Sequence, residues 1–203
     1  MEEIASHQTL RSTYGPVDSL AAVKTMPRLD KYCRDFIGLS PFLVLASADG
    51  GGGVDASPRG DAPGFVAVLD DRTLLIPDRP GNRRVDSFCN ILENPGVGLL
   101  FFVPGLPETL RVNGKARIVV DPSLLGPLAA QGKTPVAGLL IAVEEAFFHC
   151  GKALIRSRLW DKDKQIARSG FPSLGTIIAD QTRAVAAAEA DVFIEEAYRT
   201  TLY

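Results

Sequence analysis

VGLLFFVPGLPETLRVNGKARIVV, residues 97–120, consists of two apolar runs on either side of a turn that contains proline and glycine. The runs, 97–103 and 109–120, are rich in the β-branched and aromatic residues that favour strands. Two prolines and a glycine lie between them, and such residues are typical of a tight connection. The stretch therefore predicts a long apolar β-hairpin.

Further strands flank this hairpin in both directions. Strands are predicted over 42–47, 54–57, 64–69, 73–76 and 136–145, and short helices over 18–23, 29–37, 83–93 and 123–130. The periodicity of 146–155 favours neither structure. About six strands with regular turns, interrupted by short helices, predict a mainly β fold: a closed or nearly closed β-barrel with added α-helices. No GxGxxG motif follows a strand, which argues against a dinucleotide-binding sheet.

The length of 203 residues, 46% of them hydrophobic, suits one globular domain with terminal extensions. We expect an N-terminal extension over 1–28, the barrel over 29–175 and a C-terminal helix over 176–203. This last segment is rich in alanine, which favours helix. We expect it to pack within the chain or to contact a second copy.

Charge and composition exclude several classes of protein. The formal net charge is −2, so no general attraction to nucleic acid or to an anionic membrane is expected. The cysteines are Cys33, Cys89 and Cys150, and the histidines are His7 and His149. This set contains no CxxC pair and too few histidines for a zinc site. No apolar run approaches the roughly 20 residues of a membrane span, and no signal peptide is seen. We expect a cytoplasmic, soluble protein with reduced, buried thiols and no metal.

The segment IPDRPGNRR, residues 76–84, places three arginines where a strand ends and a helix is predicted to begin near Asn82. The first turn of a helix has free N–H groups and the positive end of the helix dipole, both of which attract anions. The guanidinium groups add planar donors that bind phosphate in bidentate fashion. Cations at such a position make physical sense if an anion neutralises them. The alternative is a solvated basic turn paired with Asp78 and Asp86.

A second polar cluster, SPRGD at residues 57–61, lies between apolar strands. Ser57 and Arg59 offer hydrogen bonds to an aromatic heterocycle or to its ribityl chain. Pro58 and Gly60 allow the backbone to come close to a ligand. The alternative is an ordinary hairpin loop.

A third segment, FFHCGKALIRSRLW at residues 147–160, mixes aromatic residues with three cations. A flavin needs a flat apolar wall and donors near the edge where charge accumulates on reduction. The cations are candidate donors, and Trp160 is either such a wall or a core residue. His149 and Cys150 are neighbours, and neighbours in a strand point to opposite faces, so a Cys–His nucleophile is disfavoured. No catalytic acid or base is identified.

Together these segments resemble the FMN-dependent split-barrel flavoproteins related to pyridoxamine 5'-phosphate oxidase, over about residues 30–180. The matching stretches are 55–61, 63–66, 73–84, 90–101, 108–116 and 144–161, and 74–116 is the most specific region. The resemblance implies a six-stranded split barrel. It also implies a homodimer that holds two FMN molecules at the subunit interface and acts on a small-molecule substrate.

The resemblance also assigns roles to residues of this chain. Arg83 and Arg84, helped by Asn82, correspond to the residues that hold the FMN phosphate. The other implied cofactor contacts are Ile76, Pro77 and Asp78 at the flavin edge, Ser57, Pro58 and Arg59 beside the ring and ribityl chain, Thr109 from the other chain, and, more loosely, Arg156, Ser157 and Arg158 near the C-terminus.

The chain departs from the family at its substrate residues. Pyridoxamine phosphate oxidases carry an Arg-x-His-Asp-Arg-like run near their end, whereas residues 156–160 here read RSRLW, without histidine. Residues 123–133 contain no tyrosine or arginine for a substrate phosphate. We therefore expect an FMN-dependent oxidoreductase that acts on an unidentified small molecule. The alternatives are oxidation of pyridoxamine or pyridoxine 5'-phosphate, and a flavin-binding or stress-response module without turnover.

Overall fold

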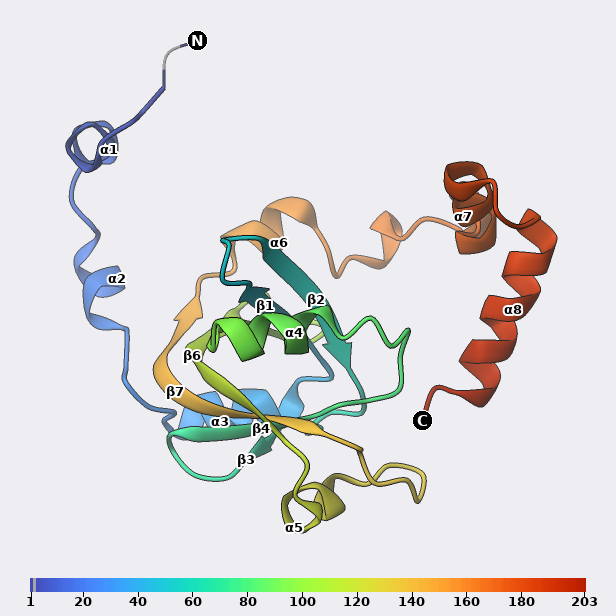
Figure 1. The fold of residues 1–203 in the computed structure, drawn as a ribbon. Coiled ribbons are helices and arrows are strands. Elements are labelled where there is room, and N and C mark those ends of the chain that lie inside the picture. The colour runs from blue at the N-terminus through green and yellow to red at the C-terminus, as the bar shows by residue number, and fades with distance from the viewer. Residues whose placement is uncertain (2) are drawn as a thin grey trace.

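The computed structural model describes Met1 and residues 3–203, and a single curved antiparallel sheet lies at its centre (Figure 1). Its strands are β1 (Phe42–Ala48), β2 (Val54–Gly60), β3 (Ala67–Val68), β4 (Thr73–Pro77), β5 (Gly96–Phe102), β6 (Thr109–Val119) and β7 (Gly138–His149). They are hydrogen-bonded in the order β2-β1-β5-β6-β7-β4-β3. The mainly β class predicted from the sequence is confirmed, and the predicted 97–120 hairpin is the pair β5 and β6.

The expected total of six strands is wrong, because the sheet has seven within the described residues, one for each run predicted individually. The shortest strand is β3, which has two residues, Ala67 and Val68. The predicted strand 64–69 is longer than β3 because Phe65 and Val66 are buried in the core without pairing to a neighbouring strand. Apolar residues can be buried in the core without belonging to a strand, so hydrophobicity alone overestimated the length of this strand.

The expected closure of the barrel is not made by backbone pairing in the described residues, since β2 and β3 are the edges of the sheet. Pro58 lies in β2 and has no N–H to donate, which is tolerated on an edge strand. Instead, Arg59 Nη1 donates to Asp78 Oδ1 over 3.3 Å. A side-chain ion pair therefore connects the ends of β2 and β4.

Helices cover and extend the sheet. They are α1 (His7–Tyr14), α2 (Ser19–Val23), α3 (Lys31–Leu39), α4 (Asp86–Glu93), α5 (Pro122–Leu125), α6 (Lys152–Ser157), α7 (Leu174–Thr182) and α8 (Ala187–Thr200), with 3-10 turns η1 (Gly126–Leu128), η2 (Lys162–Lys164) and η3 (Arg168–Gly170). Helix α3 buries Cys33, Phe36 and Ile37 against the core. Helix α4 buries Ile91 against the same core and lies next to β1.

The prediction of buried thiols holds for Cys33 alone, because Cys89 and Cys150 are exposed. Burial raises the pKa of the Cys33 thiol to about 12. This cysteine is therefore a core residue and not a nucleophile.

The C-terminal segment forms two helices and not the single one predicted over 176–203. Helix α7 ends at Thr182. The next residue, Arg183, has a left-handed backbone (φ 55°), and α8 folds back beside α7. Asp191 of α8 accepts hydrogen bonds from the Ser173 hydroxyl and from the Gly175 N–H. This contact between distant residues stabilises the helical pair, which stands at one side of the barrel, while α1 and α2 extend on the other (Figure 1). No helix in the described part of the chain is long and apolar enough to cross a bilayer.

Candidate functional site

The basic turn, residues 78–84, follows β4 and precedes α4. The helix begins at Asp86, so the prediction of a start near Asn82 is wrong. Arg83 and Val85 both have left-handed backbones, with φ of 62° and 53°, which keeps this segment out of the helix. The Asn82 side chain accepts a hydrogen bond from the Arg84 N–H at 3.1 Å. The basic turn is therefore an irregular loop that leads into the helix.

A left-handed backbone at a β-branched residue is strained, which gives a testable prediction for Val85. Left-handed geometry costs an L-residue about 1–2 kcal/mol, whereas glycine loses about 0.5–1 kcal/mol more conformational entropy on folding. Val85→Gly is thus expected to stabilise the protein without ligand by about 0.5–1 kcal/mol and to raise Tm by about 1–4 °C. Thermal unfolding followed by circular dichroism measures the change. Val136→Gly is the control, since Val136 is exposed with an ordinary backbone. An unchanged or lower Tm for Val85→Gly would contradict the assignment of strain.

The three arginines of the basic turn differ in their partners. Arg79 Nε donates to Asp61 Oδ2 at 2.6 Å, and its side chain is only 18% exposed. Arg84 Nε donates to Asp86 Oδ2 at 2.8 Å, in a pair that is largely exposed. Arg83 is exposed and has no hydrogen-bond or ion-pair partner in the described part of the chain. The interpretation as a turn paired with its own acids thus fits Arg84, while Arg83 retains all its donors.

Residues 57–61 are not the hairpin loop that one interpretation of the sequence suggested, because Ser57, Pro58 and Arg59 lie inside β2. Ser57 and Arg59 are half-buried, whereas Pro58 between them is exposed. The Arg59 Nε atom is buried and has no hydrogen-bond partner within the described residues. Burial raises the pKa of Asp78, and the neighbouring Arg59 opposes that change. An unsatisfied cationic donor therefore lies beside the basic turn.

The end of β4 contributes buried residues to this region. Ile76 and Pro77 pair with Leu139 and Gly138 of β7, and the Ile76 side chain is part of the core. Only the main chain of Ile76 is left to face a ligand. Together, the β2 residues 57–59, the β4 end 76–78 and the basic turn form one region, linked by the Arg59–Asp78 ion pair.

Thr109 lies in a different neighbourhood, at the start of β6. It is buried and pairs in register with His149 of β7. Arg111, two residues further along β6, stacks its guanidinium carbon 4.3 Å from the centre of the Phe147 ring and donates to Glu145 at 3.3 Å. Its Nε atom is buried and also lacks a partner among the residues described.

Sequence reasoning overlooked Arg111. The signal was available, because residues i and i+2 of a strand share a face, and this places Arg111 on the same face as Thr109. His149 is adjacent: burial lowers its pKa, as do the charges of Arg111 and Lys24. Its ring lies 5.0 Å from that of Phe147. The imidazole is therefore neutral near pH 7 and packs against an aromatic ring.

Arg156, Ser157 and Arg158 lie in and just after α6, and each bonds locally. Arg156 donates to the Lys152 carbonyl, and Ser157 donates to the Leu154 carbonyl. Arg158 pairs with Asp161 at 2.5 Å and with Asp163 at 2.9 Å. Each of the three side chains therefore has at least one donor engaged within its own segment.

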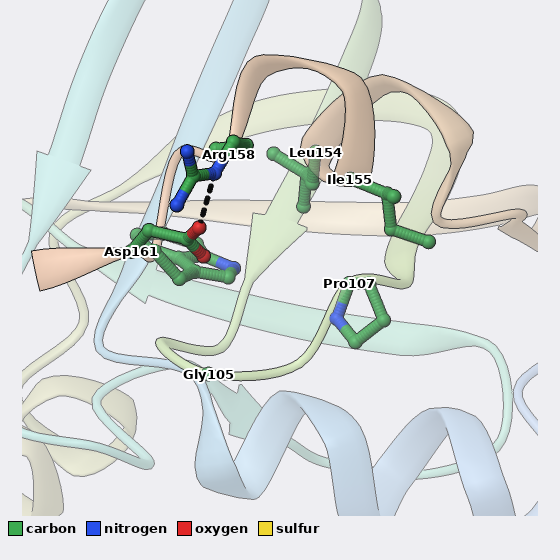
Figure 2. A pocket seen from close by; sticks show the side chains of 7 residues that line it. Gly105, Pro107, Leu154, Ile155, Arg158 and Asp161 are labelled. Carbon is green, nitrogen blue, oxygen red and sulfur yellow. Dashed lines mark hydrogen bonds and ion pairs between the residues drawn. The ribbon is translucent and has the colours of Figure 1, made fainter. Parts of the chain in front are cut away.

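A pocket of about 440 Å³ lies between α6 and the connection from β5 to β6 (Figure 2). It is lined by Gly105, Pro107, Leu154, Ile155, Arg158, Trp160 and Asp161. Trp160 donates its indole N–H to the Leu106 carbonyl at 2.9 Å, which holds the ring at the pocket. The walls are thus mostly apolar, with the Arg158–Asp161 pair as the polar part. None of the lining residues belongs to the basic turn.

Residues 29–150 match the sequence model of a family described as pyridoxamine 5'-phosphate oxidase. This range covers more than half of the chain. It includes the basic turn, the β2 residues 57–59, Thr109 and Arg111, whereas α6 and the pocket residues after it lie outside. No curated protein matches the chain in sequence.

Solved structures of similar fold include HupZ from Group A Streptococcus, which is 18% identical, covers 59% of this chain and 93% of its own, and has a TM-score of 0.49. A candidate pyridoxamine 5'-phosphate oxidase from Lactobacillus delbrueckii is 21% identical over 62% of this chain and 99% of its own, with a TM-score of 0.48. An FMN-binding protein from Syntrophomonas wolfei is 11% identical, covers 57% of this chain and 82% of its own, and has a TM-score of 0.45. Because identities and TM-scores are low, these neighbours carry no weight for the chemistry of this chain.

Proposed function

This chain belongs to the pyridoxamine 5'-phosphate oxidase family, and on that premise we propose that it is an FMN-dependent oxidoreductase acting on a small molecule. The observation that carries the proposal is the basic turn, where Arg83 is exposed and unpaired among the described residues and Arg84 has only an exposed partner. Two cations at a strained segment between a strand and a helix suit a dianionic phosphate.

The residues of the region fit FMN. Arg83, Arg84 and Asn82 would hold the phosphate, and Ser57, Pro58 and Arg59 of β2 would lie beside the ribityl chain and ring. The buried Arg59 Nε supports this assignment, because a buried donor without a partner is costly and a ligand oxygen would satisfy it. The edge of the flavin ring would lie against Ile76, Pro77 and Asp78. When bound, FMN supplies the electron-transfer chemistry.

A second copy of the chain would complete the site. We propose a homodimer in which Thr109, together with Arg111, reaches the cofactor held by the other chain. The unpartnered Arg111 Nε supports this role for the polar face of β6. A smaller part is assigned to Arg156, Ser157 and Arg158, since each already has a local hydrogen bond or ion pair.

Titration of the protein with FMN tests the proposal directly. Bound flavin is expected to lose fluorescence and to saturate at one molecule per chain, and purified protein is expected to retain a yellow chromophore. Riboflavin, which lacks the phosphate, is the matched ligand control and should bind more weakly. Absence of any flavin uptake would end the proposal.

The type of reaction requires two further assays. Oxidation of pyridoxamine 5'-phosphate is the alternative that family membership favours, and release of hydrogen peroxide with that substrate measures it. We expect none, because residues 156–160 lack the histidine of that group. Reduction of bound flavin by NADH or NADPH at a useful rate would distinguish an enzyme from a flavin-binding module without turnover.

Asp86 offers a test in which binding improves. Its carboxylate competes for Arg84 at 2.8 Å. Asp86→Asn keeps the shape of the side chain while it releases the guanidinium group, so FMN affinity is expected to rise about two- to fivefold, as for one exposed ion pair. Fluorescence titration measures the change. Asp35→Asn, which removes the exposed partner of Lys31 on α3, is the control and should leave affinity unchanged. Weaker binding by Asp86→Asn would place the phosphate away from Arg84.

A further inference from the structure

Tyr203 connects the C-terminal segment to the basic turn. Its hydroxyl donates to Asp61 Oδ1 at 2.5 Å, and the other oxygen of that carboxylate accepts from Arg79 Nε at 2.6 Å. Arg79 also donates through Nη1 to the Leu128 carbonyl at 2.9 Å. A chain of hydrogen bonds thus runs from Tyr203 through one carboxylate to the second residue of the basic turn.

This cluster is shielded from solvent at its centre. The Asp61 side chain is 5% exposed, and the Tyr203 ring centre lies 5.9 Å from the Arg79 guanidinium carbon. Burial opposes the ionisation of Asp61, but hydrogen bonds from Tyr203, from the Ala62 N–H and from Arg79 outweigh it, so the pKa of Asp61 lies below its usual value. The carboxylate is charged at neutral pH and accepts from both neighbours.

The tail segment, residues 173–203, depends on Tyr203 for its attachment. Its helices α7 and α8 pack on each other, and Val192, Phe193 and Tyr198 of α8 are exposed. Among the described residues, its only hydrogen bonds to the rest of the chain are made by Tyr203, which also accepts from Lys133 Nζ at 2.6 Å through its carbonyl. The end of the chain accordingly returns to the barrel in Figure 1.

We propose that Tyr203 is a positioning residue for the basic turn, so that docking of the tail segment and binding of a phosphate by this turn favour each other. Arg79 is held within the cluster through Nε and Nη1, which fixes the start of the turn and leaves Arg83 and Arg84 for the ligand. The part of the inference that concerns phosphate rests on the proposed function, whereas the coupling between the tail segment and the turn does not.

Hydrogen exchange of the full chain without ligand tests the coupling. Tyr203→Phe removes only the hydroxyl. It is expected to raise the exchange rates of the two hydrogen-bonded amides of the basic turn about tenfold, as for one lost hydrogen bond to a charged group. These are the Asp78 amide, which donates to the Ala137 carbonyl, and the Arg84 amide, which donates to Asn82 Oδ1. Trypsin cleavage at Arg183 in the tail segment is expected to accelerate by a similar factor. Tyr198→Phe is the control, because Tyr198 lies on α8, is 63% exposed and has no hydroxyl partner among the described residues. It should change neither rate.

The outcomes are distinct. Release of the tail segment with unchanged exchange in the basic turn, or no change in either, would overturn the proposal. Faster exchange in the basic turn of Tyr203→Phe, with a melting temperature equal to that of Tyr198→Phe, would support the proposal. It would show that the hydroxyl positions the turn and does not merely stabilise the whole fold. For phosphate, FMN is expected to slow tail cleavage in the unmodified protein and to bind Tyr203→Phe about tenfold more weakly. If the unmodified protein takes up no FMN, the proposed function fails, and the exchange measurement alone decides the coupling.

Discussion

Replacing Arg83 and Arg84 together by alanine is expected to weaken FMN binding about 100-fold or more. A hydrogen bond to a charged group contributes about 1.5–3 kcal/mol, and each tenfold change in affinity corresponds to about 1.4 kcal/mol. We take the lower value for each arginine because both side chains are exposed and Arg84 exchanges Asp86 for the ligand. Arg84→Ala alone is therefore expected to cost about 1.5 kcal/mol of binding, the lower end of the range of about 1.5–3 kcal/mol.

Fluorescence titration at two ionic strengths measures this effect, and the affinity of the unmodified protein should fall with added salt more steeply than that of the double variant. Arg34→Ala is the control: Arg34 lies exposed on α3 and has no side-chain partner in the described residues. Unchanged thermal stability of the double variant would show that the loss is one of binding. Equal affinity in the double variant and the unmodified protein would mean that the phosphate is bound elsewhere.

Much of the sheet was predictable because its strands carry local signals. The predicted runs 97–103 and 109–120 differ from β5 and β6 by one residue at their ends, since apolar residues and a proline-rich turn define both limits. Strand β7 extends to His149, where the aromatic pair Phe147–Phe148 gave no clear period. The two rings are buried by residues that are distant in sequence. For example, Phe36 of α3 packs edge-on against Phe148, a tertiary contact that no local pattern predicts.

The basic turn shows why its conformation was not predictable in detail. The left-handed backbone of Val85 opposes the preference of a β-branched residue, so propensity places the helix start too early. The residues that hold the turn are also distant in sequence: Arg79 is 18 positions from its partner Asp61, and Asp61 is 142 positions from Tyr203. No rule of periodicity or spacing connects such residues. The arginines themselves could be proposed as a phosphate site from the sequence, because they directly follow a predicted strand. Their role toward a cofactor stays a prediction.

Gly114→Ala is expected to destabilise the fold more than any other small substitution considered. A Cβ at this position would lie 2.1 Å from the Ala142 carbonyl oxygen and 3.0 Å from its carbon. Gly114 is buried in β6, which is paired on both sides by β5 and β7, so the backbone has no free direction in which to move. We expect a loss of about 3–5 kcal/mol, beyond ordinary overpacking, and a fall in Tm of about 6–20 °C.

The position of Gly114 also makes this change relevant to the site. The β6–β7 register shifts between Asn113 and Gly114, so the pairing of Thr109 with His149 on one side depends on how the strands meet there. Thermal unfolding measures the loss of stability, and Gly38→Ala is the matched control. Gly38 lies in α3 with no atom within 4 Å of an added Cβ, so alanine should stabilise the protein by about 0.5–1 kcal/mol. If Gly114→Ala has the same melting temperature as Gly38→Ala, the β6–β7 pairing differs from the one described. The position of Thr109 and Arg111 beside His149 would then differ as well.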